Sequence, residues 1–298
     1  MNDRTKITKP IRLDSHRLVW QHGPDYYNWL TEDMYQAPVN IQAEKLIKRN
    51  HLPGISKIIL VQAVANIEQT KYLLRLAHLN DSIVGVIACI DMYSPDAIRD
   101  IARLAIDPYF KGIRPKLQNS AESDWMLAAK FEPIFNCLSN FGLSFDALVK
   151  PRHLEALLVI INRFPELKIA IDHIVKPNVT MRHFETWAEN IFQISSHSHV
   201  FCKLTGLIEG SHHNANLEPV IPYMQHLIES FGAKKLMWGS DWSVLNLATD
   251  YKQWLGLTEA FLSSMTEDEK HNIWSLAASD FYNIKHDILK PQHLMEAC

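Results

Sequence analysis

The sequence predicts a single α/β domain, a (β/α)8 TIM barrel that spans residues 1–298. Three observations predict this fold. Short apolar segments recur eight times along the chain, helix-like stretches separate them, and no linker or low-complexity tract divides the chain. Strands that alternate with helices build a parallel sheet, and eight such units on a chain of this length fit a closed barrel better than an open sheet.

The apolar segments have the composition of strands that are buried on both faces of a parallel sheet. The stretch 58–61, Ile-Ile-Leu-Val, is rich in β-branched residues and shows no polar alternation. The eight predicted strands are Ile11–His16, Lys57–Ala63, Ile83–Asp91, Phe110–Leu117, Leu143–Lys150, Lys168–His173, Val200–Leu207 and Leu236–Trp242.

Helix-like stretches fill the gaps between these segments. Residues Ile67–Leu79 place four apolar side chains at helical spacing, and Ala97–Ala105 carries an apolar face of the same kind. Prolines stand near the starts of two further stretches, His153–Arg163 and Met181–Ile194, as is common at helix N-termini. The order of elements therefore predicts repeated βαβ units.

Composition excludes several classes of partner. The formal net charge is −3 with no basic excess, so we expect no nucleic-acid partner. No stretch approaches the roughly 18 consecutive apolar residues of a membrane helix, and residues 1–10 carry no apolar secretory signal. The four cysteines form no C-x-x-C pair, which is typical of a reduced protein. We therefore expect a cytoplasmic protein that binds a small molecule, with a homodimer left open as its oligomeric state.

The sequence also lacks the motifs of three common enzyme classes. It contains no G-x-G-x-x-G, no G-x-x-x-x-G-K-[ST] and no G-x-S-x-G. These absences weigh against a dinucleotide enzyme, a nucleotide hydrolase and a serine hydrolase of the usual kinds.

Polar residues gather at the carboxyl ends of the predicted strands, where the loops of a barrel converge on one mouth. Singly, each has a plainer explanation. A lone histidine that ends an apolar strand is more often structural, and an aspartate there is commonly a helix N-cap, which fits Asp172 better than Asp241. Together they favour one site, because the barrel brings all strand ends to the same mouth. The candidates are His16, Gln62, Arg114, Lys150, His173 and Asp241, with Trp20 shortly after the first strand.

Several motifs follow one another in a distinctive order. They include Leu13-Asp14-Ser15-His16, Leu60-Val61-Gln62-Ala63, Phe110 to Pro115, Ile171 to Pro177, Cys202 to Leu207 and Met237 to Trp242. In this order they resemble amidohydrolase-superfamily hydrolases of the branch that contains L-fuconolactonase-like sugar lactonases and 2-pyrone-4,6-dicarboxylate lactonase. The resemblance runs from Leu13 to about Ile284 and implies an amidohydrolase-like barrel.

The resemblance implies a role for each residue at the mouth. Asp241 would handle the attacking water, His16 and His173 would polarise or orient the substrate carbonyl, and Arg114 would bind an oxygen-rich substrate. The chain departs from the family at one position, because the usual His-x-His of the first strand is replaced here by His16-Arg17-Leu18. The fifth strand also lacks the histidine of metal-rich amidohydrolases and has Lys150 as its polar residue.

The replacement of the second histidine by Leu18 weakens the metal site that we expect. Three residues, His16, His173 and Asp241, could supply the three protein ligands of a catalytic zinc, but a tight or binuclear site is not expected without the second histidine. We therefore expect no required cofactor, or a single divalent metal, zinc, that is weakly bound. Without metal, an aspartate of ordinary pKa, about 3.9, is a weak base for water, so the site suits an electrophile that is already reactive.

These arguments predict a carboxylic ester hydrolase that opens a sugar-acid or related carboxylate-bearing lactone. Asp241 would be the general base, with His16 and His173 at the carbonyl, while Arg114 would fix the substrate together with Gln62, Lys150 and Trp20. Two alternatives stay open. One is a metal-dependent decarboxylase or hydrolase of the same superfamily, and the other is a binder that has lost catalysis with the second histidine.

Overall fold

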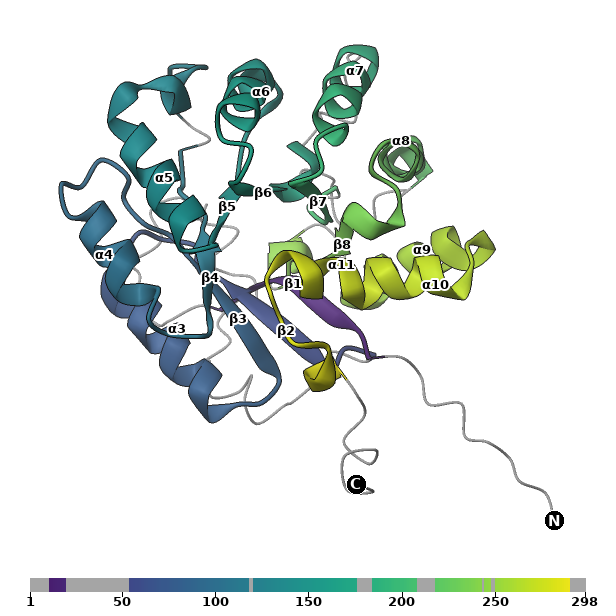
Figure 1. The fold of residues 1–298 in the computed structure, drawn as a ribbon. Helices are drawn as coiled ribbons and strands as arrows, with labels where there is room; N and C mark the ends of the chain where they lie inside the picture. Colours follow the sequence, from purple (N-terminus) through teal and green to yellow (C-terminus); the bar gives the residue numbers. More distant parts are fainter. Residues whose placement is uncertain are drawn as a thin grey trace.

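The computed structural model describes residues 11–19, 54–117, 120–175, 184–207, 218–242, 244–247 and 250–289. Within these residues, eight strands form one parallel sheet whose order in space is the order in the sequence (Figure 1). The strands are β1 (Leu13–Leu18), β2 (Lys57–Val61), β3 (Ile83–Ala88), β4 (Phe110–Ile113), β5 (Ser144–Ala147), β6 (Lys168–Ile171), β7 (Val200–Leu204) and β8 (Leu236–Trp238).

Seven of the predicted apolar segments contain one of these strands, and the first overlaps β1, which continues to Leu18. The prediction of a (β/α)8 barrel is therefore confirmed. The main difference lies at the carboxyl ends. For example, β4 ends at Ile113 although the apolar pattern continued to Leu117, and β8 ends at Trp238 rather than at Trp242. The residues beyond the strands leave the sheet, and this is where most of the candidate side chains stand.

The sheet is nearly closed into a barrel, because β1 and the segment after β8 meet along a short seam. Arg17 and Trp242 form a parallel bridge, and the Leu18 amide donates to the Trp242 carbonyl oxygen at 3.0 Å. One step further into the seam, the Asp241 amide donates to the carbonyl oxygen of His16 at 3.0 Å. The seam therefore joins the backbones of two candidate residues directly.

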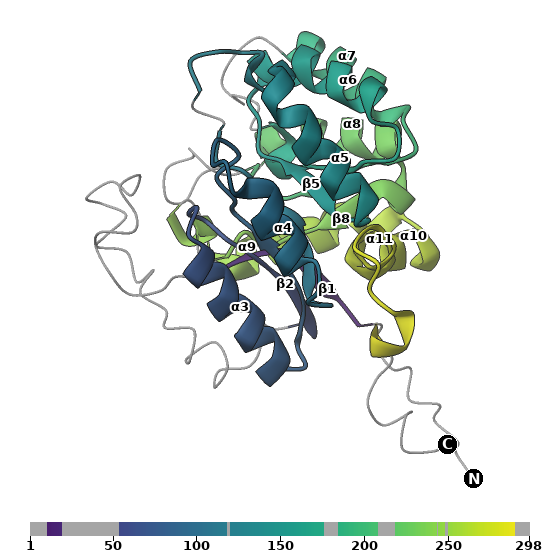
Figure 2. The same cartoon turned by 60° about the vertical axis from the view of Figure 1, so that its left-hand side comes forward.

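Most of the helices surround the sheet on its outer side (Figures 1 and 2). Helix α3 (Ile67–Leu79) begins where the Asn66 side chain accepts hydrogen bonds from the amides of Glu68 and Gln69, as an N-cap does. Its bounds are those that the sequence predicts. The other helices are α4 (Ala97–Leu104), α5 (Glu132–Asn140), α6 (Leu154–Arg163), α7 (Phe184–Ser195), α8 (Ile221–Phe231), α9 (Tyr251–Phe261), α10 (Glu267–His271) and α11 (Ala277–Phe281).

Alternate residues of the strands face two different apolar clusters, as the period of a strand requires. In β2, Ile58 and Leu60 belong to the large cluster between sheet and helices, whereas Ile59 and Val61 belong to a smaller cluster inside the barrel. Residues of α11 complete the inner cluster, and the Lys168 side chain at the start of β6 donates to the Phe281 carbonyl oxygen. Helix α11 therefore covers the amino ends of the strands and leaves the carboxyl ends for the site.

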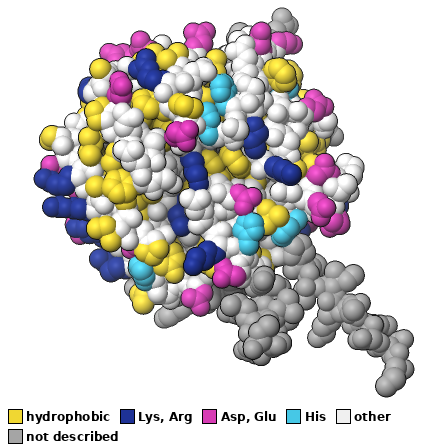
Figure 3. Space-filling model, viewed as in Figure 1, with side chains coloured by type: hydrophobic (Ala, Val, Ile, Leu, Met, Phe, Trp, Pro, Cys, Tyr) yellow, Lys and Arg dark blue, Asp and Glu magenta, His cyan; other side chains and the backbone are white. Residues whose placement is uncertain are grey.

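The surface has an ordinary mixture of side chains. Figure 3 shows acidic, basic and apolar groups interspersed over one face of the molecule, as is usual for a globular protein. Within the described ranges, each helix is too short or too polar to cross a lipid bilayer.

Candidate active site

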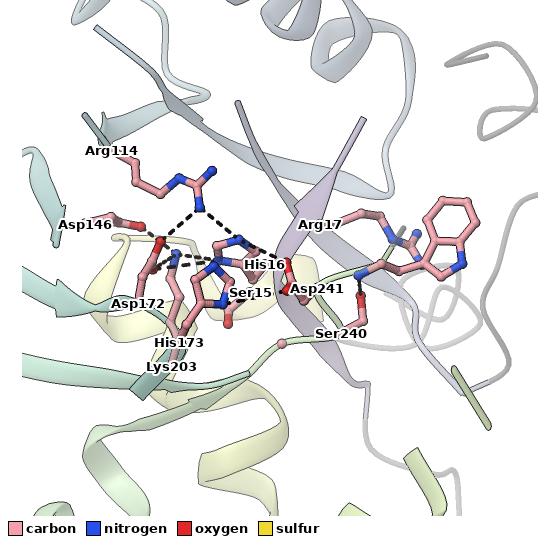
Figure 4. A network of polar contacts seen from close by, with 12 residues as sticks. Ser15, His16, Arg17, Arg114, Asp146, Asp172, His173, Lys203, Ser240 and Asp241 are labelled. Carbon is pink, nitrogen blue, oxygen red and sulfur yellow. Dashed lines mark hydrogen bonds and ion pairs between the residues drawn. The ribbon is translucent and has the colours of Figure 1, made fainter. Parts of the chain in front are cut away.

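Three side chains from distant parts of the chain meet at the carboxyl end of the barrel. His16 lies in β1, His173 lies two residues after the end of β6, and Asp241 lies three residues after the end of β8 (Figure 4). The distance from His16 Nε2 to Asp241 Oδ1 is 3.6 Å, and that from His173 Nδ1 to Asp241 Oδ2 is 3.8 Å. The two imidazole ring centroids are 4.6 Å apart, and all three residues are buried. The predicted trio thus forms one compact centre.

A β-bulge turns His16 toward this centre. Leu13 packs in the inner cluster, so strict alternation along β1 would point His16 outward. The pairing of β1 with β2 shifts register between Asp14 and Arg17, which places one extra residue in β1. His16 therefore faces the barrel interior.

The bulge leaves Asp14 and Arg17 together on the outer face of β1. Asp14 accepts from the Ser240 amide at 2.8 Å and from its hydroxyl at 2.6 Å, and Arg17 Nε lies 3.4 Å from Asp14 Oδ2. Burial raises the pKa of Asp14, while Arg17 and Ser240 oppose that rise. The Arg17 guanidinium lies over the ring of Trp242 at 5.4 Å. These contacts fix the strand ends that carry His16 and Asp241.

His173 and Asp241 have left-handed backbone conformations, with φ of 51° and 53°. Residues other than glycine seldom adopt this conformation, and it costs about 1–3 kcal/mol. Two glycines make room for the site. A Cβ on Gly206 would lie 2.3 Å from His173 Nδ1, and one on Gly239 would lie 2.8 Å from His16 Cβ. The backbone around the centre is therefore shaped to bring the three side chains together.

Arg114 brings a positive charge to the same centre. It follows β4, is buried, and its Nη1 lies 3.5 Å from His16 Nε2 (Figure 4). The same Nη1 donates to Asp172 Oδ2 at 3.4 Å, and Nη2 donates to the Gln62 carbonyl oxygen at 3.2 Å. The guanidinium is thus held by a carboxylate and a backbone carbonyl beside the two histidines.

Lys203, Asp146 and Asp172 form a buried charged group, and the sequence did not predict the part that Lys203 and Asp146 take in it. Lys203 of β7 is completely buried, and its Nζ donates to Asp146 Oδ2 at 2.6 Å and lies 3.0 Å from Asp172 Oδ1. It also lies 3.4 Å from His16 Nδ1. The hydroxyl of Tyr282, next to α11, donates to Asp146 Oδ2 at 2.7 Å. This charged group therefore lies between the trio and the apolar base of the barrel.

The charges in this group stabilise one another. Burial alone would lower the pKa of Lys203, but Asp146 and Asp172 raise it above its ordinary value, so the amine is an ammonium ion. Burial alone would raise the pKa of Asp172, but Lys203 and Arg114 hold it below its ordinary value. Burial raises the pKa of Asp146 in spite of Lys203. Asp172 is thus an ion-pair partner of two cations rather than simply the helix N-cap that the sequence suggested.

A sequence signal for this group existed. Lys203 and Asp146 are the only charged residues of two buried strands, Val200–Leu204 and Ser144–Ala147. A charge inside such a strand must be paired, because burying an unpaired charge costs several kcal/mol. Opposite charges in two strands of one predicted barrel therefore point to an internal ion pair.

The side chain of Gln62, another predicted substrate contact, points away from the site. Val61 faces the inner cluster, so the next residue, Gln62, points outward to α3. Its side chain accepts from Thr70 Oγ1 at 2.7 Å and from the Cys89 amide at 3.0 Å, and it donates to the Val64 carbonyl oxygen at 2.6 Å. Gln62 thus reaches the site through its backbone carbonyl, and this geometry lends no support to substrate contact by its side chain.

Lys150 and Trp20 are the two remaining predicted substrate contacts. Lys150 follows β5 and is half-buried, and its amide donates to His153 Nδ1 at 3.0 Å. Trp20 lies outside the described residues. Leu18, which stands where the family has its second histidine, is buried two positions after His16 in β1. An apolar side chain therefore faces the centre in place of an imidazole.

The trio has the donor set of a single divalent metal ion. One ligand atom from each of His16, His173 and Asp241 lies within 4.8 Å of the other two. Two imidazoles and a carboxylate match the three protein ligands of catalytic zinc sites. The residues therefore fit one zinc ion, although the cations of Arg114 and Lys203 lie close by.

The relatives of this chain place the fold and its candidate site among the barrel hydrolases. A family model described as amidohydrolase matches residues 13–284, and the chain belongs to this amidohydrolase family. The L-fucono-1,5-lactonase of Burkholderia ambifaria is 36% identical over 288 residues, which cover 92% of this chain and 96% of that protein. The resemblance found in the sequence is thereby confirmed.

Solved structures share the fold of this chain. An amidohydrolase from Burkholderia multivorans with bound zinc has a TM-score of 0.84 and 25% identity, covering 92% of this chain and 100% of that one. A dihydroxybenzoic acid decarboxylase from Polaromonas with bound manganese has a TM-score of 0.64 and 12% identity, covering 95% and 100%. The second likeness shows the fold alone.

Proposed function

We propose that this protein hydrolyses a sugar lactone, with L-fucono-1,5-lactone as the first substrate to test. The observation that carries the proposal is the meeting of His16, His173 and Asp241 at the carboxyl end of the barrel, with nitrogen–oxygen distances of 3.6 and 3.8 Å. Groups at these distances can act on the same water and the same carbonyl. The lactonase at 36% identity supports this class of substrate.

Asp241 is the general base in the proposed reaction. Its carboxylate accepts a proton from the attacking water as the water oxygen bonds to the lactone carbonyl carbon. A positioned base of this kind contributes about 10²–10⁴-fold to the rate. The left-handed backbone of Asp241, and the hydrogen bond that its amide donates to the His16 carbonyl oxygen, hold the carboxylate in place for this step.

Positive and hydrogen-bonding groups stabilise the negative charge that develops on the carbonyl oxygen. His16 and His173 donate hydrogen bonds to it, and the fixed guanidinium of Arg114 lies beside His16. Donors that are already in position contribute strongly in a buried site, because they need no reorganisation as the reaction proceeds. The tetrahedral intermediate then collapses, the ring C–O bond breaks, and Asp241 returns its proton to the departing oxygen. The product is the open hydroxy acid.

A lactone suits this centre better than an amide. A strained or activated lactone has a reactive carbonyl and a tolerable leaving group, so a carboxylate base and hydrogen-bond donors suffice. Arg114 also suits a substrate rich in hydroxyl or carboxylate oxygens, because a guanidinium offers several donors in one plane. Lys150 and Trp20 stay predictions as further substrate contacts.

A zinc ion would be held by His16, His173 and Asp241. When bound, such an ion lowers the pKa of its water and polarises a carbonyl. We propose that the metal is weakly bound and not required, because Leu18 takes the place of one imidazole and two buried cations lie near the ligands.

The test is lactone hydrolysis by the purified protein, followed with a pH indicator on aldonolactones and pyrone lactones. Asp241→Asn should lose about 10²–10⁴-fold in kcat, since the amide cannot accept the proton. Asp268→Asn, on the exposed surface of α10, is the matched control and should retain activity. Full activity in Asp241→Asn would contradict the assigned role. A wild-type protein that is stabilised by lactones but opens none would be a binder instead.

A further inference from the structure

Thr205 carries a buried hydroxyl group that the proposed reaction does not use. The residue directly follows β7, and its amide donates to the Lys203 carbonyl oxygen at 3.0 Å. Thr205 is completely buried, and within the described ranges its Oγ1 has no hydrogen-bond partner. A buried hydroxyl of this kind has lost the hydrogen bonds that water would give it, and this loss is unfavourable. A ligand that supplies the missing hydrogen bond would recover it.

The alternation of β7 places this side chain on the inner face of the barrel. Cys202 and Leu204 belong to the cluster between sheet and helices, whereas Phe201 and Lys203 point into the barrel. Thr205 is the next residue on the inner side, two positions closer to the carboxyl end than Lys203. The hydroxyl therefore lies between the internal ion pairs and the mouth of the barrel.

Thr205 also lies beside the reacting centre. The next residue, Gly206, packs so closely against His173 that a Cβ at Gly206 would collide with the imidazole ring. Thr205 shares the burial of the trio, because His16, His173 and Asp241 are each no more than 3% exposed. A lactone that reaches Asp241 therefore also reaches the layer of side chains that contains Thr205.

The hydrogen-bonding chemistry of Thr205 differs from that of its charged neighbours. Arg114 can only donate hydrogen bonds and an ionised Asp241 can only accept them, whereas a threonine hydroxyl does both. A substrate hydroxyl also donates and accepts, so Thr205 is its matching partner, while a carboxylate would suit Arg114. We infer that Thr205 Oγ1 binds the substrate hydroxyl on the carbon next to the lactone carbonyl.

The position of Thr205 indicates which substrate hydroxyl it binds. In the proposed reaction His173 donates to the carbonyl oxygen, and Thr205 adjoins the glycine that packs against His173. The substrate hydroxyl nearest to that oxygen is the one on carbon 2. An aldonolactone carries this hydroxyl, whereas a pyrone dicarboxylate does not. The inference thus rests on the proposed function and narrows its substrate class to 2-hydroxy lactones.

The test compares an aldonolactone with its 2-deoxy analogue in the full-length wild type and in Thr205→Val. Valine keeps the shape of threonine and removes the hydroxyl, and comparing the ratio of the two kcat/KM values between proteins cancels the different reactivities of the lactones. The wild-type preference for the hydroxylated lactone should fall about tenfold in Thr205→Val. Thr205→Ser should retain the preference. The Tm of ligand-free Thr205→Val should not decrease, because no internal hydrogen bond is lost.

Ser275→Ala is the matched control. The Ser275 hydroxyl is equally buried and likewise has no partner in the described parts of the chain. It follows Trp274, whose ring lies under the Arg12 guanidinium at the amino end of β1, so it is far from the mouth of the barrel. Ser275→Ala should change neither kcat/KM nor the preference between the two lactones.

Two results would overturn the inference. An unchanged preference in Thr205→Val would show that the hydroxyl does not contact carbon 2. An equal loss for both lactones would indicate that Thr205 orients the attacking water instead. If the wild type opens neither lactone, the proposed function fails, and thermal stabilisation by the same two compounds decides the contact. Stabilisation by the hydroxylated lactone should then be lost selectively in Thr205→Val, and equal stabilisation of the two proteins would contradict the contact.

Discussion

His173 and Asp241 face each other from two left-handed backbone positions, with φ of 51° and 53° and with Nδ1 and Oδ2 3.8 Å apart. Each conformation is costly for a residue other than glycine. Both costs are borne at strand ends that meet at one point, which indicates that the placement of these side chains, rather than stability, determines the local backbone.

Gly206 provides the space for His173. Gly206→Ala should destabilise the protein by about 1–3 kcal/mol and abolish most activity, because its φ is +72° and a Cβ would lie 2.3 Å from His173 Nδ1. Gly256→Ala in exposed α9 is the control, since nothing lies within 4 Å of its Cβ position, and it should stabilise slightly. Thermal unfolding and lactone hydrolysis measure both. Equal effects of the two substitutions would contradict the prediction.

Leu18 determines how strongly the centre holds metal. Leu18→His places a second imidazole beside His16 on the inner face of β1, so the site gains a fourth protein ligand. We expect the purified variant to bind zinc at least tenfold more tightly than the wild type. Elemental analysis and zinc titration measure this, with Leu18→Gln as a polar control that lacks an imidazole. The same zinc affinity in both variants would show that position 18 lies outside the ligand sphere.

Arg114 is predicted to bind substrate oxygen through its planar group. Arg114→Lys keeps the charge but loses the paired donors to Asp172 and the Gln62 carbonyl, so kcat/KM for a sugar lactone should fall about 10–100-fold. Arg103→Lys, an exposed residue in the last turn of α4, should leave kcat/KM unchanged. Steady-state kinetics on one lactone compares them. Wild-type kinetics in Arg114→Lys would exclude a directional role for the guanidinium.

His153 should make stability depend on pH. Burial, with the charges of Arg152 and Lys150, lowers the pKa of His153, and its Nδ1 accepts from the Lys150 amide. Because the unfolded chain binds the proton more readily, this contribution is intact above pH about 6.5 and is lost as the pH falls toward the lower folded pKa. Tm should therefore decrease on acidification. In His153→Gln the decrease should be shallower, and an unchanged slope would refute this assignment.

Periodicity and strand ends predicted much of this structure. The barrel and its eight strands follow from the recurring apolar segments, and the candidate trio follows from the polar residues at the ends of those segments. Which side chains of a strand point into the barrel, and which point outward, was harder to predict from the sequence. Gln62 stands at a strand end like the others, but it points outward because Val61 points inward.

The internal ion pairs could not be predicted from single segments. The role of Lys203 is clear only when Asp146 and Asp172 are known to lie beside it, and those contacts join β7 to β5 and to the turn after β6. The bulge in β1 is likewise invisible in the sequence, because it depends on the register with β2. Features that depend on a single strand can thus be predicted from the sequence, whereas features that depend on contacts between strands cannot.

The seam between β1 and the segment after β8 also determines when this centre forms during synthesis. The Asp241 amide donates a hydrogen bond to the His16 carbonyl oxygen. The two ends of the sheet must therefore meet before the side chains of His16 and Asp241 face each other. A nascent chain on the ribosome can pair its early strands, yet it stays inactive until nearly all of it has emerged. Partial opening of this seam would separate His16 from Asp241 while most helices stay folded. Lactone turnover should therefore be lost at a lower denaturant concentration than the helical circular dichroism signal.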